Sequence, residues 1–162
     1  MSENLKPSIT GWLQSVHHVG VSVTDIDVSL AFWTRLLNEP PVEPRVIEDP
    51  FIGTLLGYPG ARIKVAILEM AGGLSLELVE HLDPVEPRLL SGTAHPGAVH
   101  VCLAVREIDQ AWVHALACGG SKVGEGPVEI PSGPHKGARH VYVRDPNGVT
   151  IELRQQPPAP AR

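Results

Sequence analysis

Two histidines and two glutamates occupy equivalent positions in two similar parts of the 162-residue chain. His18 and His100 each begin a run that alternates apolar with small or polar residues, and Glu77 and Glu152 each lie in a later run of the same kind. Imidazole nitrogens and carboxylate oxygens are common ligands of divalent metal ions, which act as Lewis acids toward bound oxygen atoms. These residue types predict a site for one divalent metal ion (Zn, Ni, Co, Mn or Fe(II)), held by all four side chains.

An internal repeat makes the four positions equivalent. Residues 18–27 align without a gap on residues 100–109, with five of ten positions identical, and residues 73–78 match residues 148–153 in the same order. The alignment also distinguishes His18 from its neighbour, because His18 and not His17 falls opposite His100. We therefore expect two copies of one structural unit.

Each copy follows the same pattern of elements. An alternating strand is followed by an amphipathic helix, and each copy closes with a hairpin, at 61–69 with 74–80 and at 138–144 with 149–155. One face of the first and last strands is aliphatic, and the other carries one His or Glu among mainly small residues, which leaves space for a cavity. Residues 39–59, rich in proline, are expected to form an irregular stretch that shapes or covers this cavity.

The repeat also predicts the boundaries of the units. They are an N-terminal extension (1–14), a first module (15–81), a linker (82–97), a second module (98–156) and a tail (157–162).

Composition excludes several classes of protein. The formal net charge is −5 and there is no run of Lys or Arg, so no nucleic-acid partner is expected. No apolar stretch approaches the roughly 18 residues that cross a bilayer, and the first residues lack the apolar core of a signal peptide. We therefore expect a cytoplasmic protein without a membrane partner, whose two cysteines are reduced thiols.

Four segments resemble the vicinal oxygen chelate superfamily, which includes glyoxalases, methylmalonyl-CoA epimerases, extradiol dioxygenases and fosfomycin- and bleomycin-resistance proteins. They are residues 17–27, 76–80, 100–105 and 145–153, and the resemblance extends over roughly residues 15–156. It implies an α+β fold in which two tandem βαβββ modules form an incomplete barrel around a metal. It places the metal ligands at the same four residues, and together with exposed sheet edges it favours a homodimer.

Two reaction classes follow from the resemblance. In the first, a glyoxalase- or epimerase-like isomerase or lyase transfers a proton alpha to a carbonyl, with Glu77 or Glu152 as the base, on a small substrate that chelates the metal through adjacent oxygens. Glutathione is not supported as a thiol partner. Ser22 and His81 stand where bacterial glyoxalases commonly have Arg and Asn.

The second class is Fe(II)-dependent extradiol ring cleavage, with His18, His100 and Glu152 as a facial triad. Residues 133–152 resemble the dioxygenase pattern, in which Tyr142 would contact the substrate or oxygen. A third alternative is a ligand-binding or resistance protein of the same fold. In either enzyme, a small-molecule substrate is expected to meet further side chains of the cavity, which are Ser22, Cys102 and His135.

Overall fold

The computed structural model describes residues 14–40, 42–87 and 92–157, so most of the predicted extension and tail lie outside the described residues. Twelve helices and strands occur in these ranges. In chain order they are β1 (His18–Val23), α1 (Ile26–Leu37), β2 (Arg45–Ile47), α2 (Pro50–Leu56), β3 (Arg62–Glu69), β4 (Ser75–Asp83), β5 (His100–Val105), α3 (Ile108–Ala117), β6 (Ser121–Lys122), β7 (Val128–Glu129), β8 (Arg139–Arg144) and β9 (Thr150–Gln155).

The strands form two open sheets of the same design. The first has the order β1-β4-β3-β2, and the second has the order β5-β9-β8-β6, with β7 also paired to β8. In both sheets the first strand runs parallel to the last strand of its copy, and that last strand is the second arm of an antiparallel hairpin. The predicted α+β fold is confirmed, and within the described ranges neither sheet closes into a barrel.

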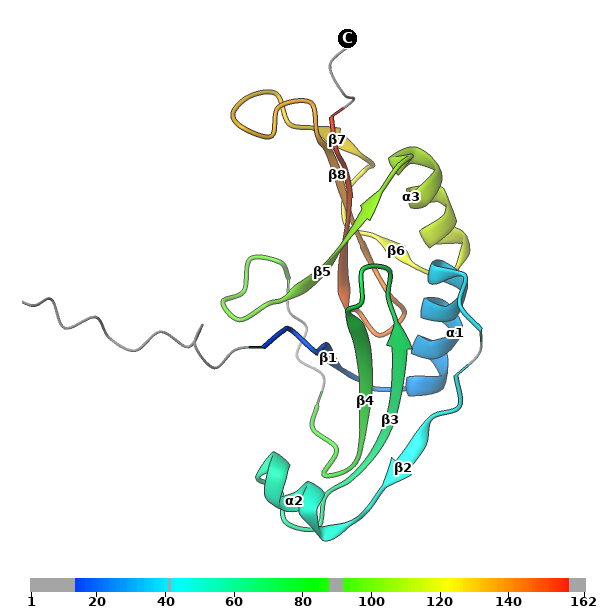
Figure 1. The fold of residues 1–162 in the computed structure, drawn as a ribbon, viewed down its shortest axis with the longest axis vertical. Coiled ribbons are helices and arrows are strands. Elements are labelled where there is room, and N and C mark those ends of the chain that lie inside the picture. The colour runs from blue at the N-terminus through cyan, green and yellow to red at the C-terminus, as the bar shows by residue number, and fades with distance from the viewer. Residues whose placement is uncertain (1–13, 41, 88–91, 158–162) are drawn as a thin grey trace, which may run out of the picture.

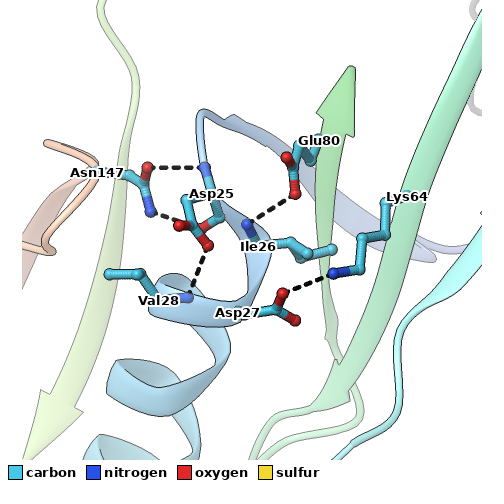
Figure 2. A network of polar contacts seen from close by, with 7 residues as sticks. All are labelled: Asp25, Ile26, Asp27, Val28, Lys64, Glu80 and Asn147. Carbon is cyan, nitrogen blue, oxygen red and sulfur yellow. Dashed lines mark hydrogen bonds and ion pairs between the residues drawn. The ribbon is translucent and has the colours of Figure 1, made fainter. Parts of the chain in front are cut away.

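The two long helices begin at matching contacts with the last strand of their own copy, although only α1 is also capped by its own N-terminal residue. The Asp25 side chain accepts a hydrogen bond from the Val28 amide at 3.0 Å, as expected for the residue that starts a helix. Glu80 of β4 accepts a second bond from the Ile26 amide at 3.0 Å, shown in Figure 2, and Gln155 of β9 does the same for Ile108 at 2.8 Å. Each helix start is thereby fixed to the last strand of its own copy.

The aliphatic faces of both sheets meet the helices in one continuous core. Figure 1 shows α1 and α3 on the same side of the molecule, where α1 contacts β3 and β4 and α3 contacts β8 and β9. The largest side chains that are fully buried there come from both copies, namely Trp33, Phe32, Ile26, Leu68, Leu76, Leu78, Ile108, Ile151 and Leu153. Burying each such side chain contributes about 1.5–3 kcal/mol, so packing holds the helices on these faces. None of the helices in the described ranges is long and apolar enough to cross a membrane.

The turn between β8 and β9 joins the second copy to the first. Asp145 is 2% exposed and accepts hydrogen bonds from the Ser29 hydroxyl at 3.1 Å and the Trp33 indole at 3.3 Å. Burial raises the pKa of Asp145, and the donors around its carboxylate oppose that shift. Asn147 hydrogen-bonds the backbone of Asp25 through both ends of its amide, as Figure 2 shows. The closing hairpin is therefore fastened to the start of α1.

The first copy contains an additional helix on the side of its sheet that faces away from α1. Asp49 caps α2, Pro50 occupies its first turn, and Ile52 packs on Ile63 and Val65 of β3. The expectation of a wholly irregular stretch at residues 39–59 is therefore wrong, because β2 and α2 form there. A short helix of this kind is stabilised by its cap and its packing, which a sequence period over 7 residues does not reveal.

Candidate metal and substrate site

The first His–Glu pair lies on adjacent strands of the first sheet. His18 of β1 and Glu77 of β4 approach within 3.3 Å, measured from Nε2 to Oε2. Gly20 is the direct neighbour of Glu77 across the two strands, and a Cβ atom there would lie 3.5 Å from Glu77 Oε2. The glycine therefore leaves the carboxylate uncovered, and the Glu77 side chain is 26% exposed.

The second His–Glu pair occupies the equivalent strands of the second sheet. His100 Nε2 of β5 lies 2.9 Å from Glu152 Oε2 of β9. Cys102 and Tyr142 flank Glu152 directly on its two neighbouring strands. The Tyr142 ring meets the His100 ring edge-on, with 5.3 Å between the ring centroids. Tyr142 therefore lies beside the predicted ligands, as the dioxygenase pattern also requires.

His140 belongs to the same group, although it was not predicted from the sequence. Its Nδ1 hydrogen-bonds Glu152 Oε1, so the carboxylate is held between His100 on one oxygen and His140 on the other. The signal was present in the alternation of β8, which puts His140 on the same face as Tyr142. Recognising the contact also requires the register of β8 against β9, which pairs Tyr142 with Glu152.

These contacts shift several pKa values in the second pair's surroundings. Burial raises the pKa of Glu152, but hydrogen bonds from His140, Cys102 and His100 outweigh it, so the pKa is lowered overall. Burial and then the Glu152 charge raise the pKa of Cys102, and the same two causes raise that of Tyr142. Glu152 is therefore ionised at neutral pH, whereas the thiol and the phenol beside it keep their protons.

The structure brings the four predicted ligands together as two pairs, one on each sheet. In each pair an imidazole Nε2 and a carboxylate oxygen point at each other, which is the arrangement in which both can bind one ion. Across residues 14–40, 42–87 and 92–157, no group of three or more His, Cys, Asp or Glu side chains is arranged so that it could hold a metal ion. Each pair fits half of a four-ligand site, and the shared metal site stays a prediction.

A cavity of about 830 Å³ is lined by His100 of the second pair and by Gly20, the cross-strand neighbour of Glu77 in the first pair. Its wall includes Gly20 next to Glu77, the ligand candidate His100, and Ser22, which is one of the three predicted substrate-binding residues. Cys102 is not part of the wall and lies against Glu152 instead. His135 lies on an exposed loop, with its Nδ1 atom 3.5 Å from the Arg154 guanidinium, and does not line the cavity.

The cavity combines apolar walls with a few polar groups. Strands β1 and β5 contribute valines, and the segment after β4 contributes prolines and Val85. Tyr58 and His81 form an edge-on ring pair at one part of the wall, with centroids 6.3 Å apart. Arg144 and Asn147 add polar groups from the β8–β9 hairpin. Apolar walls with few polar groups are typical of sites for small molecules.

Comparison with known proteins identifies the family of this chain and relatives of its sequence and fold. The model of the glyoxalase/bleomycin resistance protein/dioxygenase superfamily matches residues 17–142. A 2-epi-5-epi-valiolone epimerase from Actinomyces sp. is 30% identical over 146 residues, which are 88% of this chain and 80% of the relative.

Two solved structures share the fold at lower sequence identity. A glyoxalase family protein from Bacillus cereus superimposes with a TM-score of 0.74 at 20% identity, covering 98% of this chain and 99% of its own. A genomically encoded fosfomycin resistance protein from Listeria monocytogenes, complexed with Mn(II) and sulfate, gives a TM-score of 0.55 at 18% identity, covering 88% and 93%. The family match over residues 17–142 shows that the chain belongs to the glyoxalase/bleomycin resistance protein/dioxygenase superfamily.

Proposed function

We propose that this protein is a divalent-metal-dependent isomerase that moves a proton at the carbon next to a ketone in a small hydroxylated substrate. The observation that carries the proposal is the presence of one His–Glu pair on each sheet, with a cavity that is lined by His100 of the second pair and by Gly20 beside Glu77 of the first. The 30% identity to an epimerase favours a cyclic polyhydroxy ketone as the substrate class. Such a ketone offers a carbonyl and an adjacent hydroxyl as the two oxygens of a chelate.

The donor atoms fit a divalent ion. His18 Nε2 and His100 Nε2 would supply neutral nitrogen ligands, and Glu77 and Glu152 would supply two charged oxygens that offset the charge of the ion. When bound, the metal would polarise the substrate carbonyl and stabilise the negative charge that develops on its oxygen. Proton removal and return are then carried out by the side chains of the chain itself.

The two carboxylates have different freedom, which divides their roles. Glu77 has one polar side-chain partner among the described residues, His18 at 3.3 Å, and faces the open space above Gly20. Glu152 is 13% exposed and is held on both oxygens. We assign Glu77 as a ligand that would also take the proton from the substrate, and Glu152 as the ligand that stays fixed. The remaining substrate oxygens would meet Ser22 and the other polar groups of the cavity.

A homodimer would complete the metal site. The two pairs lie on separate sheets of one chain and do not form a group of three or more ligands within the described ranges. The same two pairs would form four-ligand sites if the first pair of one copy met the second pair of another. The partner copy would then supply half of each site.

Proton exchange tests the reaction. The metal-loaded protein is incubated in D₂O with a polyhydroxylated cyclohexanone, and deuterium at the carbon next to the carbonyl is followed by mass spectrometry and NMR. We expect exchange that stops on chelation and returns with Zn, Ni, Co or Mn. Retained exchange after thorough chelation would contradict metal dependence, and absence of exchange across a panel of such ketones would contradict the proton-transfer reaction.

Mixing two inactive variants tests the dimer. One variant lacks the first pair (H18A/E77A), and the other lacks the second pair (H100A/E152A). If the sites form between copies, random pairing restores about one quarter of the sites, because half of the dimers are mixed and each holds one intact site. If each site forms within one chain, the mixture stays as inactive as its components.

Ring cleavage by Fe(II) is the second candidate, favoured by the position of Tyr142 beside His100. The two reactions differ in their consumption of oxygen. Fe(II)-dependent oxygen uptake with catechols, without solvent exchange into ketones, would replace the isomerase by the dioxygenase. A protein with neither activity that binds an antibiotic tightly would support the resistance alternative.

A further inference from the structure

His140 is a half-buried ionisable neighbour of the second His–Glu pair. Its side chain is 19% exposed, and its Nδ1 atom hydrogen-bonds Glu152 Oε1. The other oxygen of the same carboxylate, Oε2, lies 2.9 Å from His100 Nε2. The two imidazoles therefore use different oxygens, and of these three residues only His100 lines the cavity.

The position of the proton on His140 follows from its surroundings. The Nε2 atom is buried and has no hydrogen-bond partner among the described residues. A proton on Nε2 would be a buried donor without an acceptor, which is unfavourable. A proton on Nδ1 is donated to a carboxylate instead. The neutral ring therefore carries its hydrogen on Nδ1 and acts as a donor to Glu152.

The burial of Nε2 also separates His140 from the metal-ligand candidates. A ligand must present a lone pair to the ion, as the Nε2 atoms of His18 and His100 can. In His140 the accessible nitrogen is already used by Glu152, and the free one faces the protein interior. His140 therefore acts on the site through Glu152 rather than by direct coordination.

The first copy provides an internal comparison. Val65 of β3 stands at the position equivalent to His140, because Ile67 pairs with Glu77 as Tyr142 pairs with Glu152. Val65 packs in a small apolar cluster with Ile52 of α2 and cannot donate a hydrogen bond. The donor to the carboxylate is thus present in the second copy and absent from the equivalent position in the first.

We propose that His140 is a positioning residue that holds Oε1 of Glu152 and leaves Oε2 as the single oxygen that binds the metal. This inference rests on the proposed function, because it assumes that Glu152 is a ligand. Its consequence is a division of labour: Glu152 is fixed as a one-oxygen ligand and withheld from proton transfer, whereas Glu77 keeps the mobility that a base needs.

The hydrogen bond is tested on the metal-free protein. Histidine labelled with ¹⁵N reports which ring nitrogen carries the proton, and we expect His140 as the Nδ1–H tautomer with a slowly exchanging proton. Replacing Glu152 (E152A) should remove the protection of that proton. A His140 ring with its proton on Nε2, or with rapid exchange equal to that of an exposed histidine, would overturn the proposal whether or not the protein binds a metal.

Metal affinity tests the positioning role. H140V gives the second copy the residue of the first, and H140N keeps a donor at the position of Nδ1. Removal of a group that orients a ligand typically costs 10–100-fold in metal affinity, so we expect about that loss in H140V and recovery of most of it in H140N. H95V removes an exposed histidine of the loop before β5 and serves as the control, with unchanged affinity.

A double-variant cycle separates positioning from general damage. If His140 acts through Glu152, H140V adds no further loss of Zn affinity in the E152Q background. Equal losses in both backgrounds would overturn the inference while leaving the metal site in place. A wild-type protein that binds none of Zn, Ni, Co, Mn and Fe(II) would overturn the proposed function, and the tautomer measurement would still decide the hydrogen bond.

Discussion

The two His–Glu pairs have the same residue types on equivalent strands, but their surroundings differ. Beside Glu77 stand Gly20 and Ile67, and beside Glu152 stand Cys102 and Tyr142. The first carboxylate is open and has one described polar partner, whereas the second is enclosed and held on both oxygens. A repeat can thus keep a pair of donor atoms while the neighbouring positions give each pair a different task.

The elements that lie next to the two sheets also differ between the copies. In the first copy, α2 packs on Ile63 and Val65, on the face of β3 that also carries the neighbour of Glu77. In the second copy the chain between α3 and β8 contains the two short strands β6 and β7. Apolar packing therefore supports the surroundings of Glu77, and polar contacts support Glu152.

Exchange of each carboxylate for an amide should have the largest effect and should separate the two roles. E77Q removes the proposed base, which is also one of the charged ligands, so we expect weaker metal binding and, at saturating metal, a fall in kcat of about 10²–10⁴-fold. E152Q removes the fixed ligand, so we expect mainly a loss of metal affinity. Solvent-exchange rates at saturating metal, together with metal titration, check both variants. Indistinguishable behaviour of the two variants would contradict the division of labour between the copies.

The turns of the two closing hairpins are expected to contribute differently to the free energy of unfolding. The turn of the second copy buries Asp145 under Ser29 and Trp33, whereas Met70, at the equivalent position of the first copy, packs partly buried against the apolar core, and Ala71 beside it is exposed. D145A leaves buried donors unsatisfied, each at about 1–3 kcal/mol, so we expect about 2–4 kcal/mol less stability. Urea unfolding measures the change. A71S should stay within about 0.5 kcal/mol, and an equal effect of both would contradict the stabilising role of the polar contacts of Asp145.

The raised pKa of Asp145 adds a pH dependence to this prediction. Burial disfavours the charged form in the folded state, so the folded protein binds the proton more tightly than the unfolded chain does. Stability should therefore fall as pH rises from the ordinary carboxyl value of 3.8 through the raised pKa. D145N lacks this titration, and the difference in unfolding free energy between the two proteins across that window measures it. A constant difference would contradict the shift.

Thiol reactivity gives the smallest of these effects. Burial and the Glu152 charge raise the pKa of Cys102, so alkylation at pH 7–8 should be slower than for a free cysteine, roughly in proportion to the lost thiolate. E152Q removes the charge and should shift the rate profile to lower pH. Cys118, whose pKa is raised by burial, serves as the control, because it should not respond to E152Q. Peptide mass spectrometry resolves the two rates.

Much of the fold could be predicted because its signals are local. Alternation along each strand gave the two faces, the turn residues gave the hairpins, and the gap-free repeat distinguished His18 from His17. Asp25, a residue type that commonly starts helices, caps α1 through its side chain. Each of these features depends on residues close together in the chain.

The site could be predicted only in part because its remaining features depend on tertiary contacts. The contact of His140 with Glu152 requires the register between two strands, and α2 depends on packing of Ile52 against β3. The cavity wall is formed by β1, the segment after β4 and the β8–β9 hairpin. No single stretch of sequence therefore predicts that Tyr58 or Arg144 belongs to it. The separation of the four ligand candidates into two pairs depends on the position of one sheet relative to the other. The alternation of residues along a strand does not contain that information.

The fastening of the closing hairpin to the start of α1 has a consequence for cutting the chain. Ser29, Trp33 and the backbone of Asp25 belong to one half of the chain, and Asp145 and Asn147 belong to the other. The two halves also share one apolar core. Two fragments cut between β4 and β5 would thus keep complementary apolar surfaces. They would also keep the hydrogen bonds that align the closing hairpin with α1. The chain is therefore suited to reassembly from two fragments, and recovery of the folded state would report that the hydrogen bonds between the two halves have formed again.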